Sequence, residues 1–527
     1  MFPLLPTALI FIAGIVTGNA FCRPLSAWIL ATATTLTAAF LLKQKAALQY
    51  AAVLITTFFL GAALVTHTNR QLRLPFPAGK PLSYHAVIIS KPVIHGHIAA
   101  CDMAIYKAEG YTLSRPVLVK AAFLRDTLQD NRHTLYAGLH IEAGSVMEPP
   151  RAYPAAPGFN YTRWMRVHGF TARTFILPQS WQASAQKNII ISRFLRIRLK
   201  ATMLRERLLS LLSKSKANDQ RYAVIAAMAL GDKTSLSKQT RDDFNISGGA
   251  HVLALSGLHL GIIYAILSLL FPLSGRHKWF KQAIILIAIW AYTFMVGMGA
   301  SVTRATIMLT VLSAGTVLGR GKASLNTLSL AAIVMLSADP LSLWDTGFQL
   351  SFMAVLGILL FYPFLSGIIF IKQKALRIMW NITAVSLAAQ VATAPLVMYY
   401  FGRFTCYFLL TNIITVPAAT IIIYGVVVWL LTMPVPAAGN VVAAVLLTVA
   451  GAMNYTLSVI ASLPGASIEN ISIGIPQVVG MYALIAAAAV FVFYYRHVQS
   501  VKKLDCFNKK PVKTVYISLF DGRQQRC

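Results

Sequence analysis

Long apolar runs separated by short polar segments occupy most of this 527-residue chain. A run of about 20 apolar residues is long enough to cross a bilayer as a helix. Three such runs come first, over roughly 2–21, 25–42 and 46–66. Nine more follow a polar insert, over 250–272, 279–297, 301–319, 326–338, 346–371, 380–400, 406–432, 437–461 and 475–495. The pattern predicts a polytopic α-helical membrane protein of about 12 spans, with 326–338 broken or re-entrant.

The polar insert, residues 67–220, contains no run long enough to cross a membrane. Its segments HAVIIS, RPVLVKAAFL and LHIEAGSVM are short and separated by turn residues, which predicts a small antiparallel sheet or barrel. Residues 188–216 indicate a helix instead, with Arg193, Arg196, Lys200 and Arg207 on one side. A basic amphipathic helix of this kind is typical of one that lies on lipid headgroups.

Charge is scarce and one-sided: 12% of residues are charged, about half the share in soluble domains. The 47 Lys and Arg against 16 Asp and Glu give a net charge of +31. Lys and Arg collect on cytoplasmic loops of membrane proteins. With the N-terminus inside, the inner short loops hold ten of them, against Arg23 and Arg403 outside. The ten are Lys43, Lys45, Arg276, Lys278, Lys281, Arg320, Lys322, Lys372, Lys374 and Arg377.

This asymmetry predicts a multi-pass protein of the cytoplasmic (inner) membrane, with both termini inside and residues 67–220 outside. That outer segment holds 22 Lys and Arg against 8 Asp and Glu, net +14, where topology does not require basic residues. Aromatic and basic residues interleave within it, a pattern typical of single-stranded nucleic acid binding. They are Tyr153, Phe159, Tyr161, Arg163, Trp164, Arg166, Arg173, Phe175 and Trp181. An ordinary hydrophobic core with a solvated rim is the alternative interpretation.

Polar residues inside the predicted spans are costly and therefore informative. His251, Ser256 and His259 fall in one apolar helix, and Gly257 beside them would allow a close approach. Pro395 and Pro417 are expected to break their helices, since proline removes a backbone hydrogen bond. Further polar positions are Arg304, Asp339, Asp345, Gln349, Gln390 and Asn412. Each could join two helices, but together they predict a polar path through the bundle. The pair Gly14 and Gly18 predicts helix packing.

Catalytic and metal chemistry receive little support. Ser256 and His259 could act as nucleophile and base, but no carboxylate lies in that helix to orient the histidine. His95 and His97 form only a two-residue metal motif, and the five cysteines contain no CxxC pair. We therefore predict no catalytic residue, no metal and no cofactor.

Several motifs resemble the ComEC competence-protein family in the family's order. They are ALGDKTSLSKQTRDDFNISGGAHVLALSGLHLGI, RATIM, DPLSLWDTGFQLSFMAVLGI, and QVATAPL, YYFGRF and TNIITVP, all within 222–425. PGFNYTRWMRVHGFTA at 157–172 is similar to the end of the family's outer domain.

The resemblance implies that one DNA strand passes through the membrane bundle after handling by an OB-like outer domain. Its signature places Ser256, Gly257 and His259 on that path, with Arg304, Asp345, Gln349, Gln390 and Asn412 beside it. The chain is expected to consist of helices over 1–66, an OB-like domain over 67–187, an interfacial helix over 188–220, a channel core over 221–496 and a basic tail over 497–527.

Many family members also carry a C-terminal metallo-β-lactamase-like domain, and no HxHxDH run occurs in this chain. The expectation is thus a translocation module that is not an enzyme. Implied partners are single-stranded DNA, the lipid bilayer, and other competence proteins, namely a DNA receptor, a motor ATPase and a separate nuclease. The chain itself is a candidate partner in a homo-oligomer. Two alternatives stay open: a transporter of another anionic polymer or lipid, and a membrane-embedded hydrolase or nuclease.

Overall fold

A computed structural model describes 3–21, 23–111, 113, 115–125, 135–150, 160–184, 193–213, 219–271, 277–317, 324–432 and 434–508. The chain forms two compact units, residues 1–474 and 475–527. Tyr153 and Phe159 of the interleaved aromatic series lie outside the described residues, as does the predicted tail beyond 508. The side chain of Arg193 also lies outside the described part.

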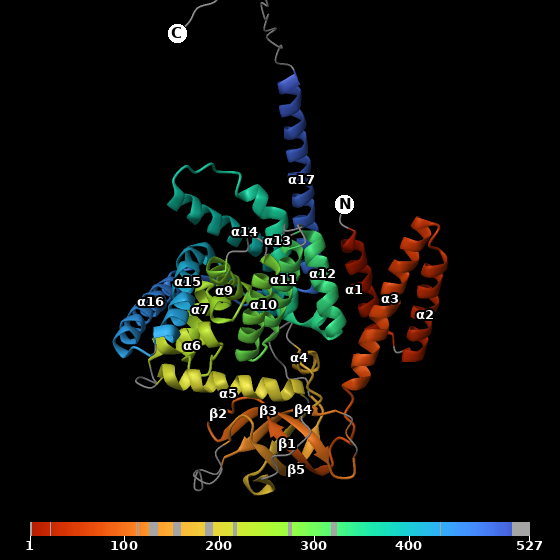
Figure 1. The fold of residues 1–527 in the computed structure, drawn as a ribbon, viewed down its shortest axis with the longest axis vertical. Coiled ribbons are helices and arrows are strands. Elements are labelled where there is room, and N and C mark those ends of the chain that lie inside the picture. Colours follow the sequence, from red (N-terminus) through yellow and green to blue (C-terminus); the bar gives the residue numbers. More distant parts are fainter. Residues whose placement is uncertain are drawn as a thin grey trace, which may run out of the picture. The chain divides into compact units, whose positions relative to one another are not determined.

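The chain begins with three consecutive helices, α1 (Leu4–Ala20), α2 (Leu25–Leu41) and α3 (Ala46–Gln71). Helix α3 packs against both α1 and α2 (Figure 1). A Cβ atom on Gly14 would overlap the carbonyl oxygen of Phe58, and one on Gly18 would lie 2.5 Å from the Cα of Ala62. These two glycines therefore allow α1 and α3 to touch through their backbones, which confirms the predicted packing role.

A small barrel follows, built from seven strands. Their bounds are β1 (Pro81–Ile88), β2 (Val93–His95), β3 (Ile98–Ala108), β4 (Val117–Leu124), β5 (His140–Glu148), β6 (Ala172–Ile176) and β7 (Trp181–Ala183). The order is β1-β3-β4-β6-β5-β7, and β1 also pairs with β5, which closes the sheet on itself. Among the described strands, β4 and β6 are the one pair that runs parallel. The predicted β-barrel-like region is confirmed.

Alternating burial along the strands explains the barrel core. Strand β4 alternates buried and half-buried positions throughout, as expected when successive side chains point to opposite faces. Tyr84, Met103, Val119 and Ile141 fill the interior. Tyr84 reaches Ser145 with its hydroxyl at 2.8 Å, and burial raises the pKa of Tyr84 to about 12. A short helix α4 (Tyr161–Val167) and a 3₁₀ turn η1 (Pro178–Ser180) complete the domain.

Helix α5 (Arg193–Ser213) joins the barrel to the membrane bundle. Leu199 packs on Val87, Ile89 and Ala104 of the barrel's outer face. Leu209, three turns further along, belongs to the main core of the bundle. Figure 1 shows α5 crossing between the barrel and the ends of the helices above it. The predicted helix over 188–216 is thus confirmed over 193–213.

An ion cluster fixes this joint. The Lys91 ammonium, after β1, lies 3.7 Å from the Glu206 carboxylate of α5 and 3.5 Å from the Asp232 carboxylate. Asp232 is only 5% exposed. Burial alone would raise the pKa of its carboxyl, but hydrogen bonds from Thr234 and the charges of Lys91 and Arg205 bring that pKa below its ordinary value.

We expect Asp232→Asn to destabilise the protein at pH 7 by roughly 1–3 kcal/mol, because Lys91 loses its buried partner. A carboxyl whose folded pKa is depressed adds stability above its unfolded pKa, about 4, and that stability is lost as the pH falls through the folded pKa. The difference between wild type and variant should therefore shrink below about pH 4. Thermal unfolding in detergent at several pH values measures it, with exposed Asp242→Asn as the control. An unchanged difference at low pH contradicts the assignment.

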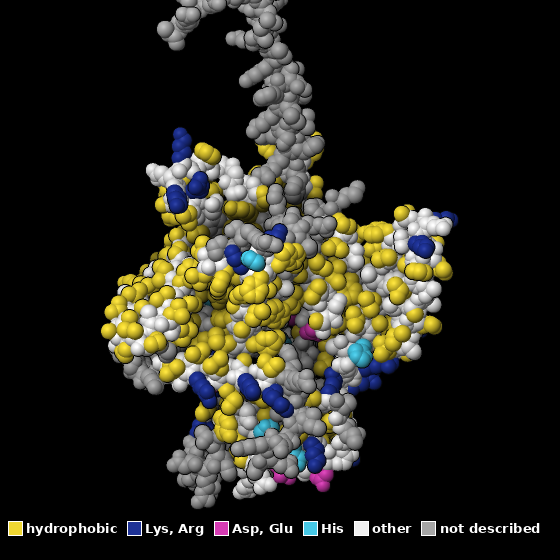
Figure 2. Space-filling model, viewed as in Figure 1, with side chains coloured by type: hydrophobic (Ala, Val, Ile, Leu, Met, Phe, Trp, Pro, Cys, Tyr) yellow, Lys and Arg dark blue, Asp and Glu magenta, His cyan; other side chains and the backbone are white. Residues whose placement is uncertain are grey.

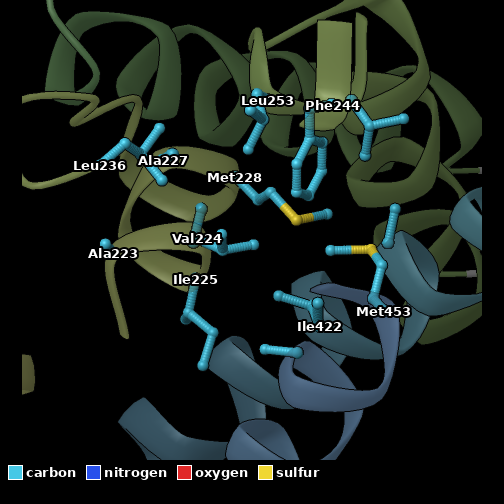
Figure 3. Close-up of a cluster of buried hydrophobic side chains, with 14 of the residues drawn as sticks. Ala223, Val224, Ile225, Ala227, Met228, Leu236, Phe244, Leu253, Ile422 and Met453 are labelled. Carbon is cyan, nitrogen blue, oxygen red and sulfur yellow. The ribbon is translucent and has the colours of Figure 1, made fainter. Parts of the chain in front are cut away.

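Eleven further helices form the bundle in the described part of unit 1. They are α6 (Gln220–Leu230), α7 (Lys238–Ser247), α8 (Ala250–Leu253), α9 (Gly257–Leu270), α10 (Lys278–Met295), α11 (Ala300–Val317), α12 (Leu325–Ala338), α13 (Thr346–Leu365), α14 (Lys374–Phe401), α15 (Phe408–Thr432) and α16 (Pro436–Ser462). A 3₁₀ turn η2 (Pro340–Trp344) precedes α13, and short strands β8 (Phe404–Thr405) and β9 (Ser467–Ile468) pair with each other. Figure 3 shows the main core, where Met228, Phe244, Ile422 and Met453 converge from α6, α7, α15 and α16.

Three expectations about helix breaks are wrong. The segment 250–272 is not one helix, because the backbone leaves the helix between α8 and α9. Helices α14 and α15 run on through Pro395 and Pro417. Of the two alternatives predicted for 326–338, the broken helix is wrong because α12 is continuous, while the re-entrant course stays a prediction.

Six helices among the described residues are long and apolar enough to cross a membrane: α3, α13, α14, α15, α16 and residues 475–492 of α17 (Ile475–Asn508). Apolar side chains cover the visible surface of the bundle (Figure 2). Leu269 and Leu431, for example, are 77% and 75% exposed. A membrane supplies the apolar surroundings that such a surface requires. The protein is a membrane protein, while the number of about 12 spans stays a prediction.

Candidate functional site

The break between α8 and α9 places Ser256 and His259 at a helix start. Ser256 is the residue before α9 and has an extended backbone, φ −129° and ψ 174°. Its backbone N–H donates to Nδ1 of His259 at 3.4 Å, and its hydroxyl lies 3.1 Å from the same nitrogen. The histidine thus caps the helix terminus, as Glu or Gln does in a capping box. This local bonding explains why an apolar run that reads as one helix is interrupted.

His259 is fully buried, whereas His251 on α8 is exposed. Because Nδ1 of His259 accepts the Ser256 N–H, a neutral ring carries its proton on Nε2. That Nε2 is buried without a hydrogen-bond partner among the described residues. Nδ1 of His251 donates to the carbonyl of Gly248 at 2.9 Å. A Cβ on Gly257 would lie 3.6 Å from that of Ala305, an ordinary contact, so the neighbouring helix does not itself require glycine at this position.

A buried ion pair lies next to this helix start. Arg304 precedes Ala305 near the start of α11. Its Nη1 donates to Asp345 Oδ2 at 2.8 Å. The two side chains are only 6% and 10% exposed. Asp345 also caps α13 by accepting from the N–H of Gly347 at 3.1 Å. A Cβ on Gly347 would lie 2.7 Å from Arg304 Nη2, so only glycine leaves room for the guanidinium.

A larger polar cluster surrounds this pair, defined here as Arg304, Asp339, Asp345, Gln349 and Tyr400. The Asp345 carboxylate interacts electrostatically with Asp339 and Tyr400. Gln349 donates to the carbonyl of Leu343 at 2.9 Å and accepts from the Tyr400 hydroxyl at 2.8 Å. Asp339 accepts from the Ser342 hydroxyl at 2.6 Å. These residues stand at the start of α11, the end of α12, the start of α13 and the end of α14. The polar cluster therefore occupies one end of the bundle.

The barrel's helix α4 covers this end. Val167 packs against the hydrophobic cluster that includes Leu336 and Phe348, and α4 contacts η2. Arg163 lies within electrostatic range of Tyr400, and His168 within range of Asp339. Sequence reasoning did not foresee this junction, because residues 163 and 400 are far apart in the chain. The barrel domain thus contributes a cation and an imidazole close to the polar cluster.

The remaining predicted path residues lie on α14 and α15. Asn412, in the first turns of α15, is half-buried with its Oδ1 unpartnered among the described residues. Its neighbour Thr411 donates to the carbonyl of Ser247 at 2.7 Å, which ties α15 to the segment before the helix break. Gln390 is half-buried and lies about 16 Å before the end of α14. Pro395, between Gln390 and that end, is buried.

Four residues of the interleaved series are the predicted DNA-gathering candidates, Arg163, Trp164, Arg166 and Arg173, and their surroundings differ. Arg163 and Arg166 are exposed. The Trp164 ring stacks on His168 at 4.4 Å and on Tyr161 at 5.9 Å between ring centroids. Arg173 donates to Glu148 at 2.7 Å, so its charge is already paired. Arg163 and Arg166 therefore stay the better candidates for phosphate contact.

Lys120 was missed by sequence reasoning, although it is central to this surface. Its ammonium lies 2.6 Å from Asp102 and over the rings of Phe170 and Trp164, at 4.5 and 5.1 Å from their centroids. Lys120, Asp102, Arg173 and Glu148 border a cavity of about 1090 Å³ on the barrel. Its wall includes Cys101, whose thiol pKa burial raises to about 12. No group of three or more His, Cys, Asp or Glu in the described part of the chain has a metal-binding arrangement.

Comparison with known proteins gives three relatives. The chain is 26% identical over 305 residues to ComE operon protein 3 of Bacillus subtilis, 57% of this chain and 37% of the relative. It is 33% identical over 187 residues to an uncharacterized protein of Aquifex aeolicus, 35% and 42% of the two chains. It is 23% identical over 206 residues to Recombination protein 2 of Haemophilus influenzae, 37% and 26%.

The matched segments thus span less than half the length of each of these relatives. No solved structure matches the chain. Residues 228–494, half of the chain, match the family described as Competence protein. This range includes every helix from α7 to α16, the helix break at Ser256 and the whole polar cluster. The chain therefore belongs to the competence protein family.

Proposed function

We propose that this protein is a channel that passes single-stranded DNA across the cytoplasmic membrane during natural transformation. The observation that carries the proposal is the convergence of buried polar groups at one end of an apolar bundle, beneath α4 of a basic outer domain. A Cβ on Gly257 would lie 3.6 Å from that of Ala305, the residue after Arg304, so the helix start at Ser256 lies close to the ion pair. The matching relatives named for a competence operon and for recombination support a role in DNA uptake.

Unsatisfied polar atoms support a path that holds water or a polar cargo. Nε2 of His259, Nε of Arg304, Oδ1 of Asn412 and Oγ1 of Thr415 are buried without hydrogen-bond partners among the described residues. Such atoms cost free energy unless water or a ligand satisfies them. Two of these groups, the imidazole and the guanidinium, are donors suited to phosphate oxygens. We propose that His251, Ser256, His259, Arg304 and Asn412 line this path, with Asp339, Asp345 and Gln349 supporting it.

In this proposal the barrel gathers the strand through Arg163 and Arg166, which are exposed beside the polar cluster. The barrel's closure with one parallel strand pair supports the OB-like expectation. The sequence has no GxxxxGK[ST] motif, so we propose that the strand is pulled by a partner ATPase and that cleavage of the other strand belongs to a separate nuclease.

The test is import of labelled DNA into the cytoplasm, with surface-bound DNA scored separately. Wild type, a clean deletion and His259→Ala are compared at equal abundance, with His97→Ala on the exposed β2–β3 turn as control. We expect import to disappear in the deletion and to fall at least about tenfold in His259→Ala, equivalent to about 1.4 kcal/mol, while surface DNA persists. Unchanged import in the deletion would sink the channel and favour transport of another anionic polymer or lipid.

A hydrolase is the second candidate, favoured by the 3.1 Å distance between the Ser256 hydroxyl and His259 Nδ1. That distance suits a nucleophile and its base. The same nitrogen, however, also receives the Ser256 backbone N–H, as expected of a helix cap. Cleavage of DNA or ester substrates by purified protein, abolished by both Ser256→Ala and His259→Ala, would establish this function in place of the channel.

A further inference from the structure

Helix α5 exposes two parallel stripes of different character. The basic stripe consists of Arg196, Lys200 and Arg207, all exposed. At 100° per residue these three positions fall within an arc of about 40°. Ile197, Leu204 and Leu211 form the apolar stripe, with exposed fractions of 52%, 49% and 36%. Their spacing of seven residues keeps them on one line beside the basic stripe.

The opposite side of α5 is occupied, so these stripes face outward. Leu199 packs on the barrel, Leu209 packs in the bundle core, and Glu206 contacts Lys91. Arg205 also turns inward, with Nη1 3.8 Å from where a Cβ on Gly297 would lie, just after α10. The helix therefore crosses the ends of membrane helices instead of running alongside them (Figure 1).

We infer that the exposed face of α5 is a binding surface for anionic phospholipids. A helix at the level where the spanning helices end lies among lipid headgroups. There the apolar stripe reaches the acyl boundary while the basic stripe meets phosphate, the arrangement that binds anionic membrane surfaces. DNA phosphate would also attract the basic stripe, but it gives no reason for three exposed aliphatic side chains in line beside it. We therefore assign membrane lipid as the ligand of this surface.

Lipid bound to α5 acts on both the barrel and the bundle, because α5 joins them. Because α5 touches the barrel through Leu199 and Glu206 and the bundle through Leu209, bound lipid holds the element that connects the two. This inference does not depend on what the bundle transports.

The experiment places the full chain in nanodiscs of phosphatidylcholine with a minority of phosphatidylglycerol. Spin-labelled forms of the two lipids report their relative association constants with the protein. We expect wild type to prefer phosphatidylglycerol, and Arg196→Gln/Lys200→Gln/Arg207→Gln to lose at least about fivefold of that preference. Arg196→Lys/Arg207→Lys should retain it, since charge and not geometry attracts the headgroups. Ile197→Ser/Leu204→Ser/Leu211→Ser should weaken association of both lipids.

The control removes basic charge elsewhere, with Lys80→Gln/Lys107→Gln on exposed barrel positions, compared with Arg196→Gln/Lys200→Gln in α5. An equal loss of preference in this control overturns the assignment to α5. So does an unchanged preference in the α5 triple variant. If that variant instead loses binding of a single-stranded oligonucleotide in phosphatidylcholine nanodiscs while its lipid preference is unchanged, the stripe is a DNA surface. Failure of the DNA import test alone would leave the lipid result unaffected, so the two proposals fail separately.

Discussion

Replacing Asp345 by Leu is expected to cost about 3–5 kcal/mol of stability, the typical result of removing one partner of a buried ion pair. The cost arises because Arg304, 5% exposed, keeps its charge without the carboxylate that compensates it. Helix α13 also loses its cap at Gly347. The free energy of unfolding in mixed micelles, measured by titration with SDS, tests this value. Glu206→Gln, which removes a half-exposed pair at 3.7 Å, should change stability by less than about 1 kcal/mol.

The double variant Arg304→Met/Asp345→Leu separates stability from transport. A buried ion pair replaced by apolar residues of similar size is often neutral for stability, so the double variant should recover much of the loss. If the pair belongs to the path, DNA import should stay low although the protein is stable again. Recovery of both quantities would make the pair purely structural. A single Asp345→Leu variant as stable as wild type would contradict the burial of an uncompensated guanidinium.

Gly14→Leu is expected to separate α1 from α3. Even a Cβ at this position overlaps backbone atoms of Phe58, which cannot rotate away as a side chain would. Overpacking typically costs about 1–3 kcal/mol, and a whole isobutyl group between two backbones should reach the upper end. The hydrogen bond from Asn69 to Asn19, 3.0 Å long, gives a local readout because it joins the two helices at one end. Disulfide formation between Asn19→Cys and Asn69→Cys should be efficient in the wild-type background and lost with Gly14→Leu.

The matched control is Gly261→Leu in α9, where a Cβ would meet no atom within 4 Å. Glycine lowers helix stability relative to other residues, so this substitution should be neutral or slightly stabilising. Equal cross-linking in both glycine variants would show that α1 and α3 tolerate separation of their backbones. Equal loss in both would point to a general effect on insertion instead of the predicted local contact.

Features set by the local order of residues were predictable. Continuous apolar runs predicted α1, α2 and α3 nearly to their ends, because a run of that length in lipid must satisfy its backbone as a helix. The short run at 115–124, set off by turn residues, predicted β4, and the alternating burial of its positions is what the structure added. The polar residues Arg304, Asp345 and Gln349 stood out for the same reason, as groups too costly for lipid. Family membership followed from motifs in sequence order.

What only the tertiary structure decided is which of these residues meet. Arg304 and Asp345 are 41 positions apart, and no pattern along the chain says that they pair. Pro395 and Pro417 were expected to break helices, but α14 and α15 continue through them. The helix break that does occur is at Ser256, where His259 caps the start of α9 within an apolar run. Likewise, α4 reaches the polar cluster because closure of the barrel carries it there. Hydrophobic spacing thus determined which segments form helices and strands, while contacts between distant side chains, which spacing does not encode, decided where the polar groups gather.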